Sequence, residues 1–394
     1  MINKKLIAYD FNELEKKCIL SDAKTLFKSN VISDEQHHKI NEQFKSKLYT
    51  PNVFVRALLF ILTYIGILTL MGPISLIFGE GIDETGMRIM AVLLGLAVLL
   101  ILDVNLVRKN HHYKSGVTEA TLLTGLLLLG FGLLGFSNHA ELTYLFLGLV
   151  FSFYAAVRYL NLIALIAVLC FTGAIVFQLL ISTGGWAKAV IPFAVMALYS
   201  LLFWLGVKLE KRLSSFVFND HFIILKVFCL LMIYLGGNYF VVRELSAELM
   251  GVWVEPGTDI PFAFLFYFFT AFIPIGYVVY GIKKKSILFV RVALLTIVLS
   301  IVTLKIYFSL GAPIVTITLS GAVMIGLSLL LFRYLKKPKK GYTREKLLDD
   351  KWDSSDLTAF VISQSLSGHK IASSDDKLEY GGGEFGGGGA GGEF

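Results

Sequence analysis

Residues 161–182 read NLIALIAVLCFTGAIVFQLLIS and contain no charged side chain. At about 1.5 Å per residue, a helix of this length crosses the roughly 30 Å hydrocarbon core of a bilayer. Its apolar residues show none of the period-two alternation of a membrane-spanning β-strand. Because a chain in lipid must satisfy its own backbone hydrogen bonds, this run predicts a transmembrane helix.

Similar runs recur along the chain, which is 56% hydrophobic and 16% charged with a mean hydropathy of +0.71. A soluble domain averages roughly 25% charged residues. We therefore predict an all-α fold, a polytopic membrane bundle of about ten transmembrane helices. The predicted spans are 54–78, 87–107, 117–136, 142–160, 161–182, 187–207, 219–241, 260–282, 286–305 and 313–334. The short gap at 158–161 leaves open a tight hairpin or a re-entrant pair.

The charges of the loops predict the orientation. One set of loops is basic and the alternate set is acidic, as the positive-inside rule requires when both termini lie in the cytoplasm. The basic set contains Arg108, Lys109, Lys114, Lys208, Lys211, Arg212, Lys283, Lys284, Lys285, Lys336, Lys337, Lys339 and Lys340. The acidic set contains Glu80, Asp83, Glu84, Glu244, Glu248, Glu255 and Asp259. The lipid bilayer is therefore the first predicted partner.

The chain divides into four parts. Residues 1–53 predict a helical cytoplasmic head, in which Ser33-Asp34-Glu35-Gln36 has the form of a capping box. The bundle follows at 54–334. Residues 335–372 form a charged cytoplasmic segment with a short amphipathic helix at 356–366. The last part, 373–394, is polar and glycine-rich and cannot bury enough apolar surface to fold alone, so we predict a disordered tail.

Two segments resemble known families. FKSNVISDEQHHKINEQF (27–44), followed by VRALLFILTYIGILTL (55–70), resembles the bacterial multi-pass membrane family called domain of unknown function 2157. That resemblance implies a helical head before a series of spans, and a location in the bacterial cytoplasmic (inner) membrane. The family has no established activity to carry over. The ending GGGEFGGGGAGGEF (381–394) resembles the glycine-and-aromatic tails of membrane proteins with a TPM domain.

Signatures of soluble enzymes and of cofactor sites are missing. The sequence has no Walker loop, HExxH or GxSxG motif, and the Gly130-x-Gly132-x-x-Gly135 pattern lies inside a span, where small residues favour close helix packing. The adjacent His111-His112 pair and three scattered cysteines predict neither a metal site nor a disulfide framework. The net charge of +7 comes from short loops and not from a nucleic-acid-binding patch. We predict no cofactor, no metal and no nucleic acid.

Four ionisable residues inside the spans are the candidate intramembrane site. Charged groups in a bilayer are costly, and Asp103, Glu119, Lys226 and Arg291 all fall within about 4–11 Å of the cytoplasmic boundary. Two interpretations remain open. The two cations and two anions either pair with each other, or the basic side chains reach the lipid headgroups unaided.

The tail offers a second candidate site. Tyr380, Phe385 and Phe394 are spaced along flexible glycine, which allows a chain to enter a narrow groove or to add to a sheet edge. A cytoplasmic or membrane protein that recognises these aromatic side chains is the second predicted partner. The alternative is a tail without a partner.

The sequence supports three functional hypotheses. The first is a non-enzymatic scaffold, sensor or assembly factor that acts through its head and tail. The second is a small-molecule or lipid transporter with a five-plus-five helix arrangement, although the two halves show no evident self-similarity. The third is an intramembrane enzyme, for which no nucleophile–base or metal pair is found.

Overall fold

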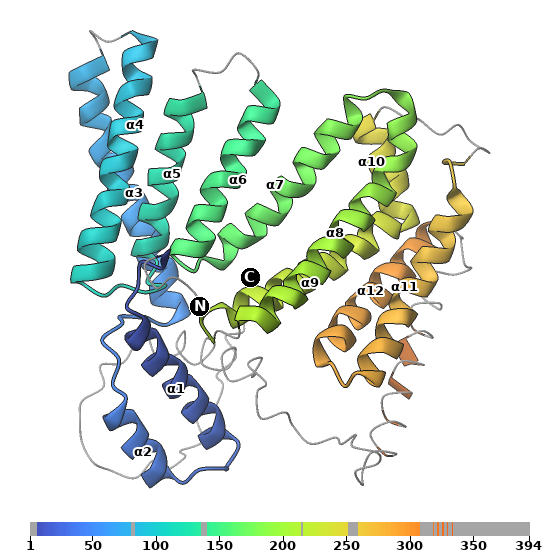
Figure 1. Ribbon diagram of the computed structural model, residues 1–394, viewed down its shortest axis with the longest axis horizontal. Coiled ribbons are helices and arrows are strands. Elements are labelled where there is room, and N and C mark those ends of the chain that lie inside the picture. The colour runs from blue at the N-terminus through green and yellow to red at the C-terminus, as the bar shows by residue number, and fades with distance from the viewer. Residues whose placement is uncertain are drawn as a thin grey trace, which may run out of the picture. The chain divides into compact units, whose positions relative to one another are not determined.

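A computed structural model describes residues 6–79, 83–134, 140–213, 216–250 and 259–307, with a few isolated positions between 318 and 333. All regular structure within these ranges is helical, which confirms the predicted all-α bundle (Figure 1). Nine of the helices there are long and apolar enough to cross a membrane. The predicted span at 313–334, the segment 335–372 and the tail lie almost entirely outside the described residues.

The nine spans agree closely with the predicted ones. They are carried by α3 (Val53–Gly79), α4 (Glu84–Ile101) with its continuation η2 (Leu102–Lys109), α5 (Val117–Leu134), α6 (Ala140–Arg158), α7 (Leu162–Ile181), α8 (Gly185–Leu213), α9 (Asn219–Gly237), α11 (Ala263–Lys283) and α12 (Ile287–Tyr307). The gap at 158–161 is a tight hairpin, since α6 and α7 are two full helices that pack against each other. The chain is thus a multi-pass integral membrane protein.

The head consists of α1 (Phe11–Lys28) and α2 (Asp34–Gln43), which lie beyond the lower ends of α3 and α5 in the view of Figure 1. The predicted capping box is present. The Ser33 hydroxyl accepts a hydrogen bond from the Gln36 N–H at 3.3 Å, and the Ser33 N–H donates to the Gln36 side chain at 2.9 Å. Reciprocal capping fixes the first residue of α2.

Glycines allow α4 and α5 to pack closely. A methyl group added at Gly132 would lie 2.7 Å from the Arg88 carbonyl, and one added at Gly125 would lie 2.7 Å from the Leu99 side chain. The Arg88 carbonyl is backbone and cannot move aside, so the contact requires glycine at position 132, whereas a methyl group at 125 would require the Leu99 side chain to shift. The predicted role of small residues in this stretch therefore holds at Gly132, whereas Gly130 faces open space.

One boundary differs from the prediction. The seventh span was expected to run to residue 241 and a loop to follow at 242–259. Instead, α9 ends at Gly237, and a separate helix, α10 (Tyr239–Met250), occupies the start of that loop. Asn238 makes the break: its backbone is extended, and its side-chain oxygen accepts the Val241 N–H at 3.2 Å as the cap of α10.

Candidate functional site

The head is fixed to one end of the bundle through its first residues. The Ala8 N–H donates to the Arg158 carbonyl at 2.9 Å, at the α6–α7 hairpin. Ile7, Tyr9 and Leu14 are buried in one cluster with bundle residues that include Leu102, Leu122 and Tyr159. Full burial of such a side chain stabilises by roughly 1.5–3 kcal/mol, so docking of the head is worth several kcal/mol.

The connection from the head to α3 is held as well. The Tyr49 N–H donates to the His111 carbonyl at 2.9 Å, and the Tyr113 N–H donates back to the Tyr49 carbonyl at 3.0 Å. This short parallel bridge attaches the linker to the loop between η2 and α5. Because the head is held at residues 7–14 and again at 49, it is not a freely swinging appendage.

Glu13 joins α1 to the same linker. Its buried carboxylate accepts hydrogen bonds from the Lys16 ammonium at 2.7 Å and from the Lys47 N–H at 2.6 Å. These two donors, Lys16 first, hold the pKa of Glu13 below its usual range, and burial opposes them only in part.

We expect the linker to loosen as the pH falls below about 4. Because the pKa of Glu13 is lower in the folded state, its ionised carboxylate stabilises the fold at pH values above the ordinary carboxyl pKa. That contribution is lost as the pH falls through the folded-state pKa of Glu13. Hydrogen exchange of the Lys47 amide between pH 7 and pH 3, corrected for the intrinsic rate, should show this loss. In Glu13→Gln the amide should be less protected at neutral pH and show little further change; an unaltered pH profile in that variant would contradict the assignment.

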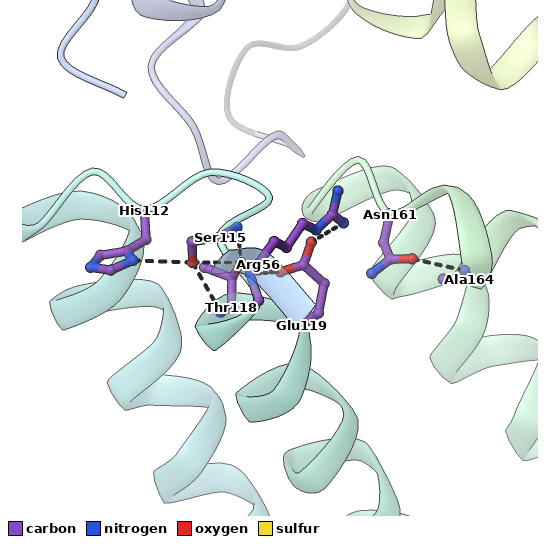
Figure 2. Close-up of polar contacts among 8 residues, drawn as sticks. Arg56, His112, Ser115, Thr118, Glu119, Asn161 and Ala164 are labelled. Atoms are coloured by element: carbon purple, nitrogen blue, oxygen red, sulfur yellow. Dashed lines mark hydrogen bonds and ion pairs between the residues drawn. The ribbon is translucent and has the colours of Figure 1, made fainter. Parts of the chain in front are cut away.

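The polar network of the site lies where α3 and α5 begin. Arg56 of α3 forms an ion pair with Glu119 of α5. The second oxygen of Glu119 accepts the Gly116 N–H at 2.7 Å and the Thr118 hydroxyl at 2.8 Å. In Figure 2 the Arg56 side chain reaches between Glu119 and Asn161, the residue that caps α7.

A cavity of about 80 Å³ adjoins this network. Its lining combines polar groups, Arg56, Lys114, Glu119 and Asn161, with apolar ones such as Leu122 and Ile163. Tyr9 of the head also lines the cavity. The cavity therefore lies at the junction of the head with the bundle.

Positive charge gathers at this junction. The ammonium groups of Lys17 and Lys114 both lie over the Tyr113 ring, 4.7 and 5.4 Å from its centroid. Desolvation of Lys17, together with the positive charges of Lys114 and Arg56, lowers its pKa to about 8. Three basic side chains thus converge from α1, α3 and the loop before α5.

Asp103, a predicted site residue, lies in η2. This segment is a π-helix, a rare form that often occurs at functional positions. The two carboxylate oxygens of Asp103 form ion pairs with the guanidinium groups of Arg158, at 2.7 Å, and Arg108, at 2.8 Å. Asp103 therefore joins η2 to the α6–α7 hairpin, with partners that the sequence analysis did not include in the site.

Lys226 likewise pairs with a residue that is not one of the four predicted site residues. Its ammonium lies 2.8 and 3.0 Å from the two oxygens of Glu210, which joins α9 to the end of α8. Glu119 pairs with Arg56, as described above, and Arg291 occupies an exposed position near the start of α12. Three of the four predicted residues thus hold separate helix–helix ion pairs and not one common cluster.

A second polar cluster lies where α9, α10, α11 and α12 meet. The buried Asn238 amide donates to the Tyr234 hydroxyl at 2.8 Å and to the Thr303 hydroxyl at 2.9 Å. Beside it, Asp259 accepts the Tyr239 hydroxyl at 2.6 Å, and Arg243 donates to that same hydroxyl at 2.6 Å. Burial opposes ionisation of Asp259, but hydrogen bonds from Tyr239 and the Ile260 N–H hold its pKa below the usual range.

The tail residues Tyr380, Phe385 and Phe394 lie beyond the part of the chain that the structure describes. Within that part, no three His, Cys, Asp or Glu side chains are placed together to hold a metal ion. No family model matches the chain, and neither a curated protein nor a solved structure matches it.

Proposed function

We propose that this integral membrane protein is a non-enzymatic scaffold, sensor or assembly factor of the bacterial cytoplasmic membrane. The observation that supports the proposal is the buried attachment of the head. Ile7, Tyr9 and Leu14 share one hydrophobic cluster with the ends of the bundle helices. A change in the packing of those helices must therefore reach the head, and a partner held by the head is fixed relative to the membrane. We also propose that the chain belongs to the family it resembles, domain of unknown function 2157, which has the same arrangement of a helical head before a series of spans.

The experiment compares the proteins captured by three chains: the full-length chain, a chain without residues 1–50, and a chain truncated at Tyr380. We expect the full-length chain to retain a partner that at least one truncation loses. Identical capture by all three chains would contradict a role that depends on the head and tail.

We predict that the partner of the tail binds to the aromatic side chains of the tail. Phe385→Ser with Phe394→Ser should abolish capture of the tail's partner and leave membrane insertion intact, because serine cannot fill an apolar pocket. Ordering glycine-rich backbone costs roughly 1–2 kcal/mol per residue, so the aromatic contacts must supply most of the affinity.

The matched control is Glu384→Ser with Glu393→Ser, which places the same new residue beside each phenylalanine and keeps both rings. It should retain the partner. If the phenylalanine variant recovers the same proteins as the wild type, the tail is not a recognition element.

A transporter is the alternative, and the cluster around Asn238 favours it, since buried polar groups in a bilayer often mark a transport pathway. The Asn238 amide nitrogen nevertheless donates to the hydroxyls of Tyr234 and Thr303. Its oxygen accepts hydrogen bonds from the Val241 N–H and the Thr303 hydroxyl. This satisfied network explains helix packing without a substrate, so we place the scaffold or sensor first.

A further inference from the structure

The cavity at the head–bundle junction lies at the N-terminal ends of three helices. Arg56 is in the first turn of α3, Glu119 is in the first turn of α5, and Asn161 is the residue before α7. The N-terminal end of a helix carries partial positive charge from its unpaired N–H groups. Three such ends around one cavity add to the charge of the basic side chains.

The only carboxylate among the cavity residues described above is already neutralised. One oxygen of Glu119 binds the Arg56 guanidinium, and the other accepts the Gly116 N–H and the Thr118 hydroxyl. Arg56 and Lys114 also line the cavity, and their positive charges both lower the pKa of the nearby Lys17. Among the residues that line the cavity, the two cations Arg56 and Lys114 outnumber the one carboxylate, and this balance favours an anion.

Another part of the cavity lining belongs to a membrane-spanning helix. Leu162 and Ile163 begin the span of α7, and Ile163 is 73% exposed on an apolar helix. A basic cavity whose lining includes an exposed apolar residue of a span matches an amphiphile with an anionic head. The cavity is small, about 80 Å³, and partly open, so it can hold a phosphate group while the rest of a larger ligand extends outside.

We propose that this cavity binds the phosphate group of an anionic phospholipid from the adjacent leaflet. The phosphate lies against Arg56 and Lys114, and an acyl chain follows Ile163. Basic pockets between transmembrane helices at the cytoplasmic boundary are suited to such headgroups. Free phosphate has the same anionic chemistry, but it gains nothing from the apolar wall. The lipid is the signal that a sensor at this junction would read, and in that respect the inference rests on the proposed function.

The test measures lipid binding to the full-length protein by native mass spectrometry after delipidation in detergent. The probes are phosphatidylglycerol, phosphatidylcholine and inorganic phosphate. We expect phosphatidylglycerol to bind at least fivefold more tightly than phosphatidylcholine, and inorganic phosphate at millimolar concentration not to displace it. Equal binding of the two lipids, or displacement by phosphate alone, would overturn the assignment.

Two double variants locate the site. Arg56→Gln with Glu119→Gln should weaken phosphatidylglycerol binding at least fivefold. The control, Glu84→Gln with Arg88→Gln, neutralises another arginine–glutamate pair, at the start of α4, and should bind like the wild type. Each double variant keeps the net charge of the chain, so a general electrostatic effect would act equally on both. Unchanged binding in a folded Arg56/Glu119 variant would overturn the proposal.

The single variant Glu119→Gln separates binding from structure. It removes negative charge beside the cavity and keeps Arg56, so lipid binding should strengthen, whereas damage to the fold would weaken it. Weaker binding in a variant whose thermal unfolding midpoint equals that of the wild type would contradict the proposed electrostatics. Loss of lipid binding leaves the capture experiment on the head and tail unaffected, so failure of this inference is distinguishable from failure of the proposed function.

Discussion

Gly116→Ala is expected to destabilise the protein by about 4 kcal/mol or more, which is exceptional for the addition of one methyl group. Gly116 has a φ of +88°, and its added Cβ would lie 2.0 Å from the Arg56 carbonyl oxygen. That oxygen belongs to the backbone of α3 and cannot rotate away. The methyl group must therefore separate α3 from α5 and disturb the bond between the Gly116 N–H and Glu119.

The control for this prediction is Gly130→Ala, in the α5 helix that begins directly after Gly116. Nothing lies within 4 Å of a Cβ at Gly130, and alanine favours helix, so its effect should be small. Thermal unfolding of both variants in the same detergent gives the comparison. A midpoint for Gly116→Ala equal to that of Gly130→Ala would show that α3 and α5 do not approach each other as described.

Asp103→Ala is expected to lower the free energy of unfolding by about 3 kcal/mol, at the lower end of the range for removing one partner from a buried ion pair. The carboxylate is the shared partner of two arginines. The Arg158 side chain is only 21% exposed, so its charge would lose its carboxylate partner in a largely buried position. Arg108, at 63% exposure, can instead turn to water.

This asymmetry provides the controls. Arg108→Ala should cost less than about 1 kcal/mol, as for an exposed pair. Arg158→Ala combined with Asp103→Ala should cost less than the sum of the two single variants, because the one charge left without its partner, Arg108, is exposed. Denaturation in mixed micelles measures all four stabilities. If Asp103→Ala costs no more than Arg108→Ala, the link between η2 and the α6–α7 hairpin has no structural importance.

The bundle could be predicted from the sequence because its determinants are local. A run such as 161–182 is helical in lipid whatever surrounds it. At 158–161 the sequence left a tight hairpin or a re-entrant pair open, and the two full helices α6 and α7 decide for the hairpin. The break at Asn238 was missed because the apolar run continues across it, and hydropathy does not register a side chain that caps a new helix.

The partners of the charged residues could not be predicted in the same way. Asp103 and Glu119 were singled out because a carboxylate in a span is conspicuous. Their partners Arg158 and Arg56 lie at span ends, where basic residues are common, so the sequence alone gave no reason to select them. The docking of Tyr9 depends on contacts between segments more than a hundred residues apart, and no local pattern records them.

We propose that the end of the bundle that holds the head, the cavity and the ion pairs of Asp103, Glu119 and Lys226 faces the cytoplasm. A reporter enzyme that is active only outside the cytoplasm tests it, fused after Glu84, Lys114, Glu255 or Lys284. We expect activity from the fusions after Glu84 and Glu255, and silence from those after Lys114 and Lys284, because the basic loops remain inside. Activity after Lys114 or Lys284, with silence after Glu84 or Glu255, would contradict the orientation on which the whole account rests.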